Sequence, residues 1–518
     1  MMRFFAILIL FILSAYLTSS QDYIFNSHYG FPVNEKDIYF KDINTSLRPV
    51  LGSESEFFDS LIFYNFKEKD LPLFRRKMFH EHLYVSKSEG YRLVINPIFD
   101  FRYNQNSAGN TTGFLNTRGI AAFGRLNSKI WFNTSFYENQ GSFPHHIDSF
   151  YSKYNIIPGY SRIKPYKDNA YDFMTAFGNI SVKPANNLIF TFGTDKNFIG
   201  DGYRSVLLSD FSCPYLFLKT SLNYKKLTFN HIISHTLNPN YHNIMELEGE
   251  WSENMAYPGK LISYNYLTWN INKNFQLGFF EAVIFDARHD KIWNYAALNP
   301  VPYMNTGIYG FDNVNNALAG LNFSYQNQKY GVVYSQFLID KIELSKNRKK
   351  YDNRLAWQLG YKSFDFLTVK NLYFQFEYNH ADALTYSHKY PTQHYGQFNQ
   401  ALAHPAGSGF DEFVVITKYS YKRFSVFTKL NYLQYQYAGS FDMKNIFNQE
   451  PFLKPMTIVS RGNTVIYSDS QIIFHVNKTI GLQIFGGIIF RQDLLFDEKN
   501  MFVQFGLRTA LRANYYDF

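Results

Sequence analysis

The residues best suited to chemistry lie in one glycine-rich stretch, residues 193–210, which reads GTDKNFIGDGYRSVLLSD. Its centre places the carboxylate of Asp201, the phenol of Tyr203 and the guanidinium of Arg204 close together. A phosphate-binding loop would need GxxxxGK[ST] followed by a helix, whereas VLLSD leads to Pro214 and a strand-like run. Planar polar groups beside an aromatic ring suit two other roles: contact with sugar hydroxyls, or an internal tether for the loop itself.

A second group of candidate ligands is the set of histidines in the polar stretch 379–410, which comprises His380, His388, His394 and His404. Their spacing matches neither HExxH on a helix nor the paired ligands of a structural zinc site. We therefore predict no metal and no cofactor. His388 and His404 remain candidates for contact with a polar ligand.

The residues needed for hydrolysis do not form a recognisable catalytic motif. The nucleophile-elbow pattern GxSxG is absent, and Glu246, Glu248 and Glu250 alternate along an extended run that is typical of a solvated face or a cation site. Cys213, the single cysteine, stands beside Pro214 at the start of a strand-like run, where a buried spacer is expected. The sequence thus predicts a protein that is not an enzyme.

What remains is binding chemistry. Asn299 and Tyr303 lie in another aromatic and polar stretch, LNPVPYMNTGIYGFDN, so the predicted polysaccharide-binding residues are Asp201, Tyr203, Arg204, Asn299, Tyr303, His388 and His404. Basic residues at alternate positions of strand-like runs predict a basic lumen, formed by Lys219, Lys225, Lys362, Lys418, Lys422, Arg508 and Arg512. A basic interior attracts anionic polymers.

The scaffold for these residues is predicted from a period of two that persists from Tyr91 onward. Leu216, Leu218 and Leu222 share one face of a run, while Phe217 and Lys219 share the other. The runs are about ten residues long, which suits a tilted bilayer-spanning strand better than a soluble strand of about five or six. Tyr and Phe often end the apolar faces, as in an aromatic girdle. We expect an all-β fold: a transmembrane antiparallel β-barrel of about 18 strands over residues 91–518.

The first 90 residues differ from the rest. Residues 1–20 contain Arg3, an apolar core and small residues before Gln21, which predicts a signal peptide. Residues 21–90 are predicted to form a periplasmic or plug region. Within it, apolar residues at helical spacing in 54–83, interrupted by Pro72, predict two short helices.

The charge composition limits the classes of partner that can be expected. Lys and Arg exceed Asp and Glu by 51 − 42 = +9, and the excess is scattered apart from the run KNRKK at 346–350. No nucleic-acid module accompanies this run, so we expect it to be a solvated loop and predict no nucleic-acid partner.

Several motifs in a fixed order resemble a known family. FIGDGYRSVLLSD is followed by GFFEAVIF, ALNPVPY with DNVNNALAGLNFSY, VVYSQFLIDKI, FQFEYNHADALTYSH and LAHPAGSGFDEF. The set resembles the Bacteroidota outer-membrane family of Wzi-like capsule assembly and RemB-type gliding motility proteins. The chain departs from the family pattern at Ala383, Leu384, Ser408 and Gly409. The resemblance implies a barrel with a small helical N-terminal part that holds capsular polysaccharide or assists gliding.

Together these features predict a non-enzymatic outer-membrane barrel that binds or organises surface polysaccharide in capsule attachment or gliding. The expected partners are outer-membrane lipid and lipopolysaccharide, surface or capsular polysaccharide, and other cell-surface motility or secretion proteins. Two alternatives stay open: a porin-like transport channel, which a basic lumen fits equally well, and an interaction subunit of a secretion or motility complex.

Overall fold

A computed structural model of the chain describes most of the region predicted to be a barrel. The described residues are 23–24, 46–51, 71–106, 112–127, 129–154, 156–161, 163–167, 169–237, 259–285, 295–309, 315–342, 353–388, 393–436, 462–509, 511 and 514–518. The predicted signal peptide, the KNRKK run, the three alternating glutamates and Arg512 lie outside them.

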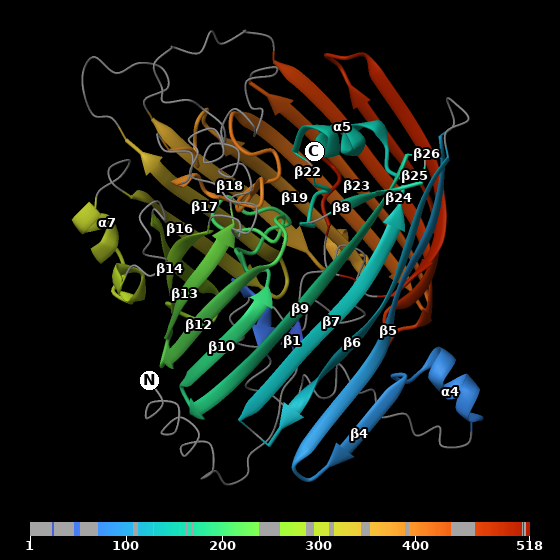
Figure 1. The fold of residues 1–518 in the computed structure, drawn as a ribbon, viewed down its shortest axis with the longest axis horizontal. Helices are drawn as coiled ribbons and strands as arrows, with labels where there is room; N and C mark the ends of the chain where they lie inside the picture. The colour runs from blue at the N-terminus through green and yellow to red at the C-terminus, as the bar shows by residue number, and fades with distance from the viewer. Residues whose placement is uncertain are drawn as a thin grey trace, which may run out of the picture.

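The 18-stranded barrel is confirmed: long strands pair with their sequence neighbours in antiparallel fashion and close into a ring (Figure 1). Closure comes from β26 pairing with β5, in register from Phe502–Asn106 to Arg508–Asp100. The strands are β5 (Tyr91–Asn106), β6 (Thr112–Leu126), β7 (Ile130–Gly141), β9 (Ala170–Ala185), β10 (Leu188–Asp195), β12 (Tyr215–Tyr224), β13 (Leu227–Leu237), β14 (Gly259–Asn270), β15 (Phe275–Phe285), β16 (Asn316–Asn327), β17 (Gly331–Lys341), β18 (Arg354–Ser363), β19 (Leu372–Ala381), β22 (Phe410–Tyr421), β23 (Phe424–Tyr435), β24 (Asn463–Asn477), β25 (Leu482–Asp493) and β26 (Glu498–Arg508).

The wall has the predicted two faces. On β12, Leu216 and Leu218 are 42% and 41% exposed on the outside, whereas Phe217 and Lys219 are buried on the inside. Successive strand residues point to opposite faces. The exposed apolar set of side chains therefore faces lipid, and the alternate set faces the lumen. The lumen face also carries Lys362, Lys418 and Arg508, as predicted from the alternation.

The prediction of a lumen position is incorrect for Lys225 and Lys422. Both side chains are exposed in tight turns, after β12 and β22, and both residues have positive φ angles, 53° and 54°. The alternation of side chains stops where the strand ends. The prediction continued it one residue too far, and so it placed Lys225 and Lys422 on the lumen face although they belong to turns. Short turns are typical of the periplasmic end of a bacterial barrel, and we orient the molecule accordingly.

Short elements complete the fold. Two short strands, β4 (Tyr84–Ser88) and β8 (Ile163–Tyr166), extend the edges of β5 and β9. Near the N-terminus, β1 (Tyr23–Ile24) pairs with β3 (Val50–Leu51), and β2 (Leu47–Arg48) pairs with β11 (Phe198–Ile199). The remainder are α4 (Leu73–Phe79), α5 (His145–Tyr154), η1 (Tyr295–Leu298), α7 (Met304–Tyr309), η2 (Phe366–Thr368), β20 (Gly396–Gln397) and β21 (Gln400–Ala401).

The predicted N-terminal helices can be compared with the structure only after Pro72. There α4 begins at Leu73, directly after the proline, and the earlier predicted helix lies outside the described residues. In the described part of the chain, no helix has the length and apolar character needed to cross a membrane.

The lipid-facing role of the outer wall can be tested with Leu359, which lies midway along β18 and is 55% exposed. We expect Leu359→Arg to lower the free energy of unfolding by about 2–4 kcal/mol, because a charge near the bilayer midplane is poorly solvated. Reversible unfolding in lipid vesicles measures the change. The control is Leu494→Arg, in the turn after β25, where the side chain is 52% exposed and a loss below about 0.5 kcal/mol is expected. Equal losses in both variants would contradict the assignment.

Candidate functional site

The stretch that opened the sequence analysis folds into the lumen. β10 ends at Asp195, β12 begins at Tyr215, and nearly all of the connection between them is buried. Ile199 and Leu207 join the largest apolar cluster, which includes Phe217 and Phe280 from the inner wall. The connection is therefore a folded insertion, held by the same interior that it fills.

A second insertion, whose described residues are 382–388 and 393–409, packs on the first. The Tyr386 and Tyr395 hydroxyls donate hydrogen bonds to the carbonyls of Val206 and Leu207, at 2.8 and 2.9 Å. The two tyrosine rings stack with their centroids 6.0 Å apart. A buried tyrosine requires a hydrogen-bond partner for its hydroxyl. Here the partners lie on the first insertion, so these hydrogen bonds link the two insertions.

At the centre of the lumen Arg204 forms a buried ion network. Its Nη2 lies 2.9 Å from Glu412 Oε1 and 3.1 Å from Asp517 Oδ1, and all three side chains are fully buried. Asp517 also pairs with Lys429 at 2.8 Å and accepts a hydrogen bond from the Tyr203 hydroxyl at 2.7 Å. The network thus joins the first insertion, the wall strands β22 and β23, and the C-terminal tail.

The charges in this network support one another. Burial acts to raise the pKa of Asp517, but the cations of Arg204 and Lys429 outweigh it and hold that pKa well below its ordinary value. Burial acts to lower the pKa of Arg204, and the carboxylates of Asp517 and Glu412 reverse the effect. Both groups are therefore ionised, and each stabilises the charged form of the other.

Glu377, on β19, holds the backbone of the insertion. Its carboxylate accepts hydrogen bonds from the backbone N–H of Tyr203 and, at 3.1 Å, from that of Arg204. It also accepts from the Tyr334 hydroxyl at 2.6 Å and from Gln375 Nε2 at 2.8 Å. A buried carboxylate with this many donors fixes the turn that presents Arg204 to Glu412.

Asp201 is buried, and its carbonyl accepts a 2.5 Å hydrogen bond from Lys362 Nζ. The neighbouring Gly200 has a φ angle of 133°, and a Cβ there would lie 2.2 Å from Gln336 Nε2. The φ angle favours glycine strongly, and a side chain there would also force the Gln336 amide to move. The Gly200 N–H donates to the carbonyl of Ser46 at 2.7 Å, so the N-terminal segment also reaches into the lumen.

His404 belongs to the same network and is neutral. The backbone N–H of Ala406 donates to His404 Nδ1 at 3.1 Å, so Nε2 carries the proton and donates to Glu412 Oε2 at 2.6 Å. Burial lowers the pKa of His404, in agreement with the neutral form. His388 is also buried, at 2% exposed. Four of the predicted ligand residues, Asp201, Arg204, His388 and His404, are thus enclosed by protein, and Tyr203 is half-buried among them.

Asn299 and Tyr303 lie elsewhere, on the outside of the barrel. Phe280 and Ala282 face the lumen, so Glu281 between them faces outward. Its carboxylate accepts hydrogen bonds from the backbone N–H groups of Tyr303 and Thr306, both at 2.9 Å. The segment 295–309, with α7, therefore covers the outer wall and does not line the lumen (Figure 1).

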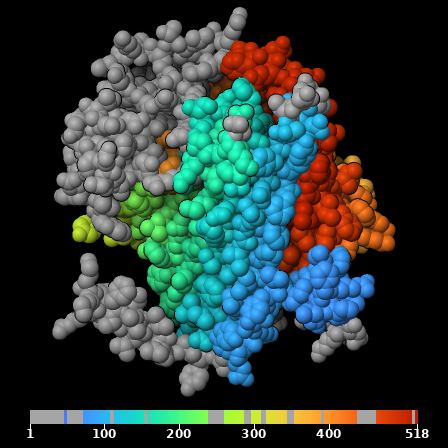
Figure 2. All heavy atoms as spheres, turned by 45° about the vertical axis from the view of Figure 1, so that its right-hand side comes forward, coloured from blue at the N-terminus to red at the C-terminus, as the bar shows by residue number. Residues whose placement is uncertain are grey.

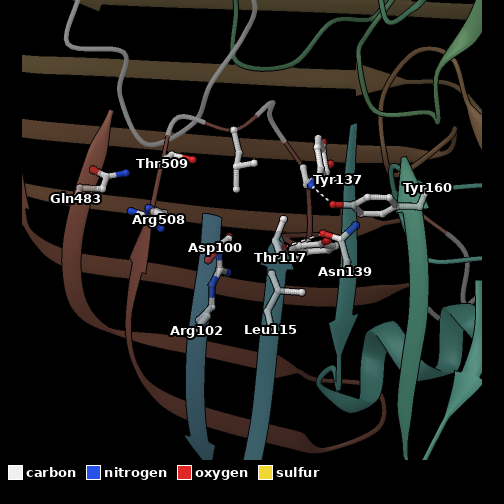
Figure 3. A pocket seen from close by; sticks show the side chains of 13 residues that line it. Asp100, Arg102, Leu115, Thr117, Tyr137, Asn139, Tyr160, Gln483, Arg508 and Thr509 are labelled. Carbon is white, nitrogen blue, oxygen red and sulfur yellow. Dashed lines mark hydrogen bonds and ion pairs between the residues drawn. The ribbon is translucent and has the colours of Figure 1, made fainter. Parts of the chain in front are cut away.

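A polar cavity adjoins the network on the lumen side of β5–β7 and β25–β26 (Figure 3). Its volume is about 600 Å³, including the solvent at its open side. The lining consists of Asp100, Arg102, Leu115, Thr117, Tyr137, Asn139, Tyr160, Gln483, Arg508, Thr509, Leu511, Asn514 and Tyr516. Of these, sequence analysis identified only Arg508, because the others come from distant strands and the tail.

The cavity offers hydrogen-bond acceptors. Asp100 and Gln483 are each 3% exposed, and among the described residues Asp100 Oδ1 and Gln483 Oε1 accept no hydrogen bond. The other carboxylate oxygen of Asp100 pairs with Arg102 at 2.7 Å. Buried acceptors without a protein partner are costly unless water or a ligand donates to them.

Two observations bear on metal binding and on the reactivity of the cysteine. They contain no group of three or more His, Cys, Asp or Glu side chains arranged to hold a metal ion. Burial raises the pKa of the Cys213 thiol to about 12, so it is protonated and unreactive at neutral pH.

Comparisons with known proteins agree with this fold. No family model matches the chain, and no curated protein matches it by sequence. Among solved structures it is similar to Wzi of Escherichia coli, a carbohydrate-binding outer-membrane β-barrel involved in group 1 capsule assembly. Sequence identity is 10%, the TM-score is 0.53, and the match covers 95% of this chain and 100% of that chain. Pseudomonas aeruginosa OccK7 (OpdD) also matches, with 8% identity, a TM-score of 0.44, and 81% and 97% coverage. The chain has the fold of an outer-membrane barrel.

The importance of the ion network can be tested by Arg204→Gln. This change leaves Glu412 and Asp517 buried without their shared cation, and we expect a loss of roughly 3–5 kcal/mol in the free energy of unfolding. Denaturant titration in detergent micelles, followed by tryptophan fluorescence, measures it. The turn variant Lys225→Gln serves as the control and should change little.

A double variant sharpens this test. Asp517→Asn alone should also destabilise, but Arg204→Gln with Asp517→Asn should lose less than the sum of the two single changes, because the groups interact directly. Additive losses would show that Arg204 and Asp517 act independently.

Proposed function

We propose that this protein is a non-enzymatic outer-membrane barrel that binds or organises surface polysaccharide, in capsule attachment or assembly or in gliding motility. The observation that carries the proposal is the packed interior. Two insertions and the C-terminal tail are fixed across the lumen by buried ion pairs and hydrogen bonds. A rigid interior suits a fixed binding surface better than a diffusion path.

Two further points support the proposal. Wzi, which shares the fold, is itself a carbohydrate-binding barrel. The ordered motifs from FIGDGYRSVLLSD to LAHPAGSGFDEF favour the Bacteroidota family of Wzi-like and RemB-type proteins, and most of them lie on the insertions and the strands that hold them.

Within this function the predicted residues take different roles. Asp201, Tyr203, Arg204, His388 and His404 position the insertions. We assign saccharide contact to the cavity, because its polar lining, which includes Asp100 and Gln483, suits sugar hydroxyls and its tyrosine rings offer apolar faces. Asn299 and Tyr303, on the outer wall, are not part of this cavity.

Gln483 provides a direct test, because no hydrogen bond to its side-chain oxygen is formed by the described residues. We expect Gln483→Leu to weaken binding of polysaccharide from the native cell surface by about five- to tenfold, which corresponds to one lost hydrogen bond. Isothermal titration with the purified barrel measures the affinity. The matched control is Gln434→Leu, at an exposed position on the outward face of β23, where no change is expected.

Conductance separates this function from transport. In a planar bilayer the purified barrel should remain closed, whereas a porin-like channel would give a steady open current. A steady current, together with no detectable polysaccharide binding by the unmodified protein, would overturn the proposal.

A further inference from the structure

Several apolar side chains of the helix α4 are not covered by any of the described residues. Leu73, Phe74, Met78 and Phe79 are 64%, 76%, 40% and 36% exposed, and the helix has no buried residue. Four exposed large apolar side chains on a seven-residue helix are unfavourable in water. Something apolar is expected to cover them.

The helix is held firmly in this orientation by the turn between β24 and β25. Asn477 Nδ2 donates to the carbonyls of Lys77 and Glu81, both at 3.0 Å. Thr479 Oγ1 donates to the carbonyl of His80 at 2.6 Å. These bonds satisfy carbonyls at the C-terminal end of α4, which otherwise lack partners. The barrel therefore fixes the orientation of the helix and, with it, the direction in which the exposed apolar side chains point.

The position of α4 on the barrel indicates that lipid contacts its exposed apolar side chains. α4 lies outside the wall, near the end that carries the short turns (Figures 1 and 2). The nearby strands present lipid-facing residues to the outside: Ile472 is 63%, Ile484 is 51% and Phe424 is 56% exposed. The exposed apolar side chains of α4 thus lie next to the lipid-facing belt at the periplasmic rim.

The charges around the helix are basic. Arg76 and Lys77 pair with Glu81 at 3.4 and 3.0 Å, whereas Arg75 is exposed and has no acidic partner among the described residues. The adjacent turns add Lys422, Arg423 and Lys478. Lys478 Nζ and Arg423 Nη1 donate to backbone carbonyls, and neither side chain forms an ion pair with a carboxylate of the described residues.

We propose that α4 is an interfacial helix that inserts its exposed apolar side chains, Phe74 and Met78 first, into the periplasmic leaflet and binds the phosphate groups of anionic phospholipids through Arg75 and the neighbouring basic turns. Amphipathic helices with basic residues bind in this manner, by apolar burial together with attraction to anionic headgroups. The helix would fix the depth and rotation of the barrel in the membrane.

Hydrogen exchange of the full-length protein in nanodiscs tests the proposal. We expect the amides of α4 to exchange several-fold more slowly in discs of phosphatidylcholine with phosphatidylglycerol than in discs of phosphatidylcholine alone. Arg75→Glu should remove this difference, because each basic residue near the surface contributes about fivefold in affinity. Lys225→Glu, an exposed basic residue in another turn of the same rim, should preserve it.

A second variant separates the apolar contribution. Phe74→Ser with Met78→Ser should speed exchange of α4 in both lipid compositions, while strand amides stay protected and so report an intact barrel. Exchange of α4 at one rate in both lipids and in detergent would overturn the proposal. Protection seen in native envelopes but not in nanodiscs would also overturn it and would indicate a protein partner.

Discussion

The structure depends on the burial of one guanidinium inside a barrel. Arg204 cannot be placed in the lumen without opposite charges, because an unpaired buried cation costs several kcal/mol. Glu412 supplies one charge from the wall, and Asp517 supplies another from the tail. The insertion, the wall and the C-terminus are therefore stable only together.

The membrane imposes the complementary constraint on the outer wall. The outward face of the strands must be largely apolar to meet lipid, so most of the polar strand residues are directed inward, where several of them bind the insertions. Glu281 is a polar residue that faces outward on β15, and there the segment 295–309 covers the wall and donates hydrogen bonds to the carboxylate. A polar group on the lipid side is tolerated because its partners come from the same chain.

Alternation along the strands made the barrel predictable, because a period of two follows directly from backbone geometry. The network was not predictable, since Arg204 and Asp517 are 313 positions apart and meet only after the ring has closed. Asn299 and Tyr303 show another limit. A long connection at a strand end can fold over the inner or the outer face, and composition alone does not distinguish the two. The turns at Lys225 and Lys422 show that period alone does not locate the end of a strand.

The same interactions change the expected chemistry of binding. A basic lumen suggested attraction of acidic polymers, but Arg204 is neutralised by carboxylates and Lys362 is bound to a backbone carbonyl. In the proposed function, the polar side chains that line the cavity, among them Asp100 and Gln483 with their hydrogen-bond acceptors, would meet the ligand. Such acceptors discriminate by the position of donor groups rather than by net charge, since a ligand that fails to donate leaves buried oxygens without a partner. In the proposed function, selectivity for the hydroxyl pattern of a sugar would follow from the way in which the lumen is packed.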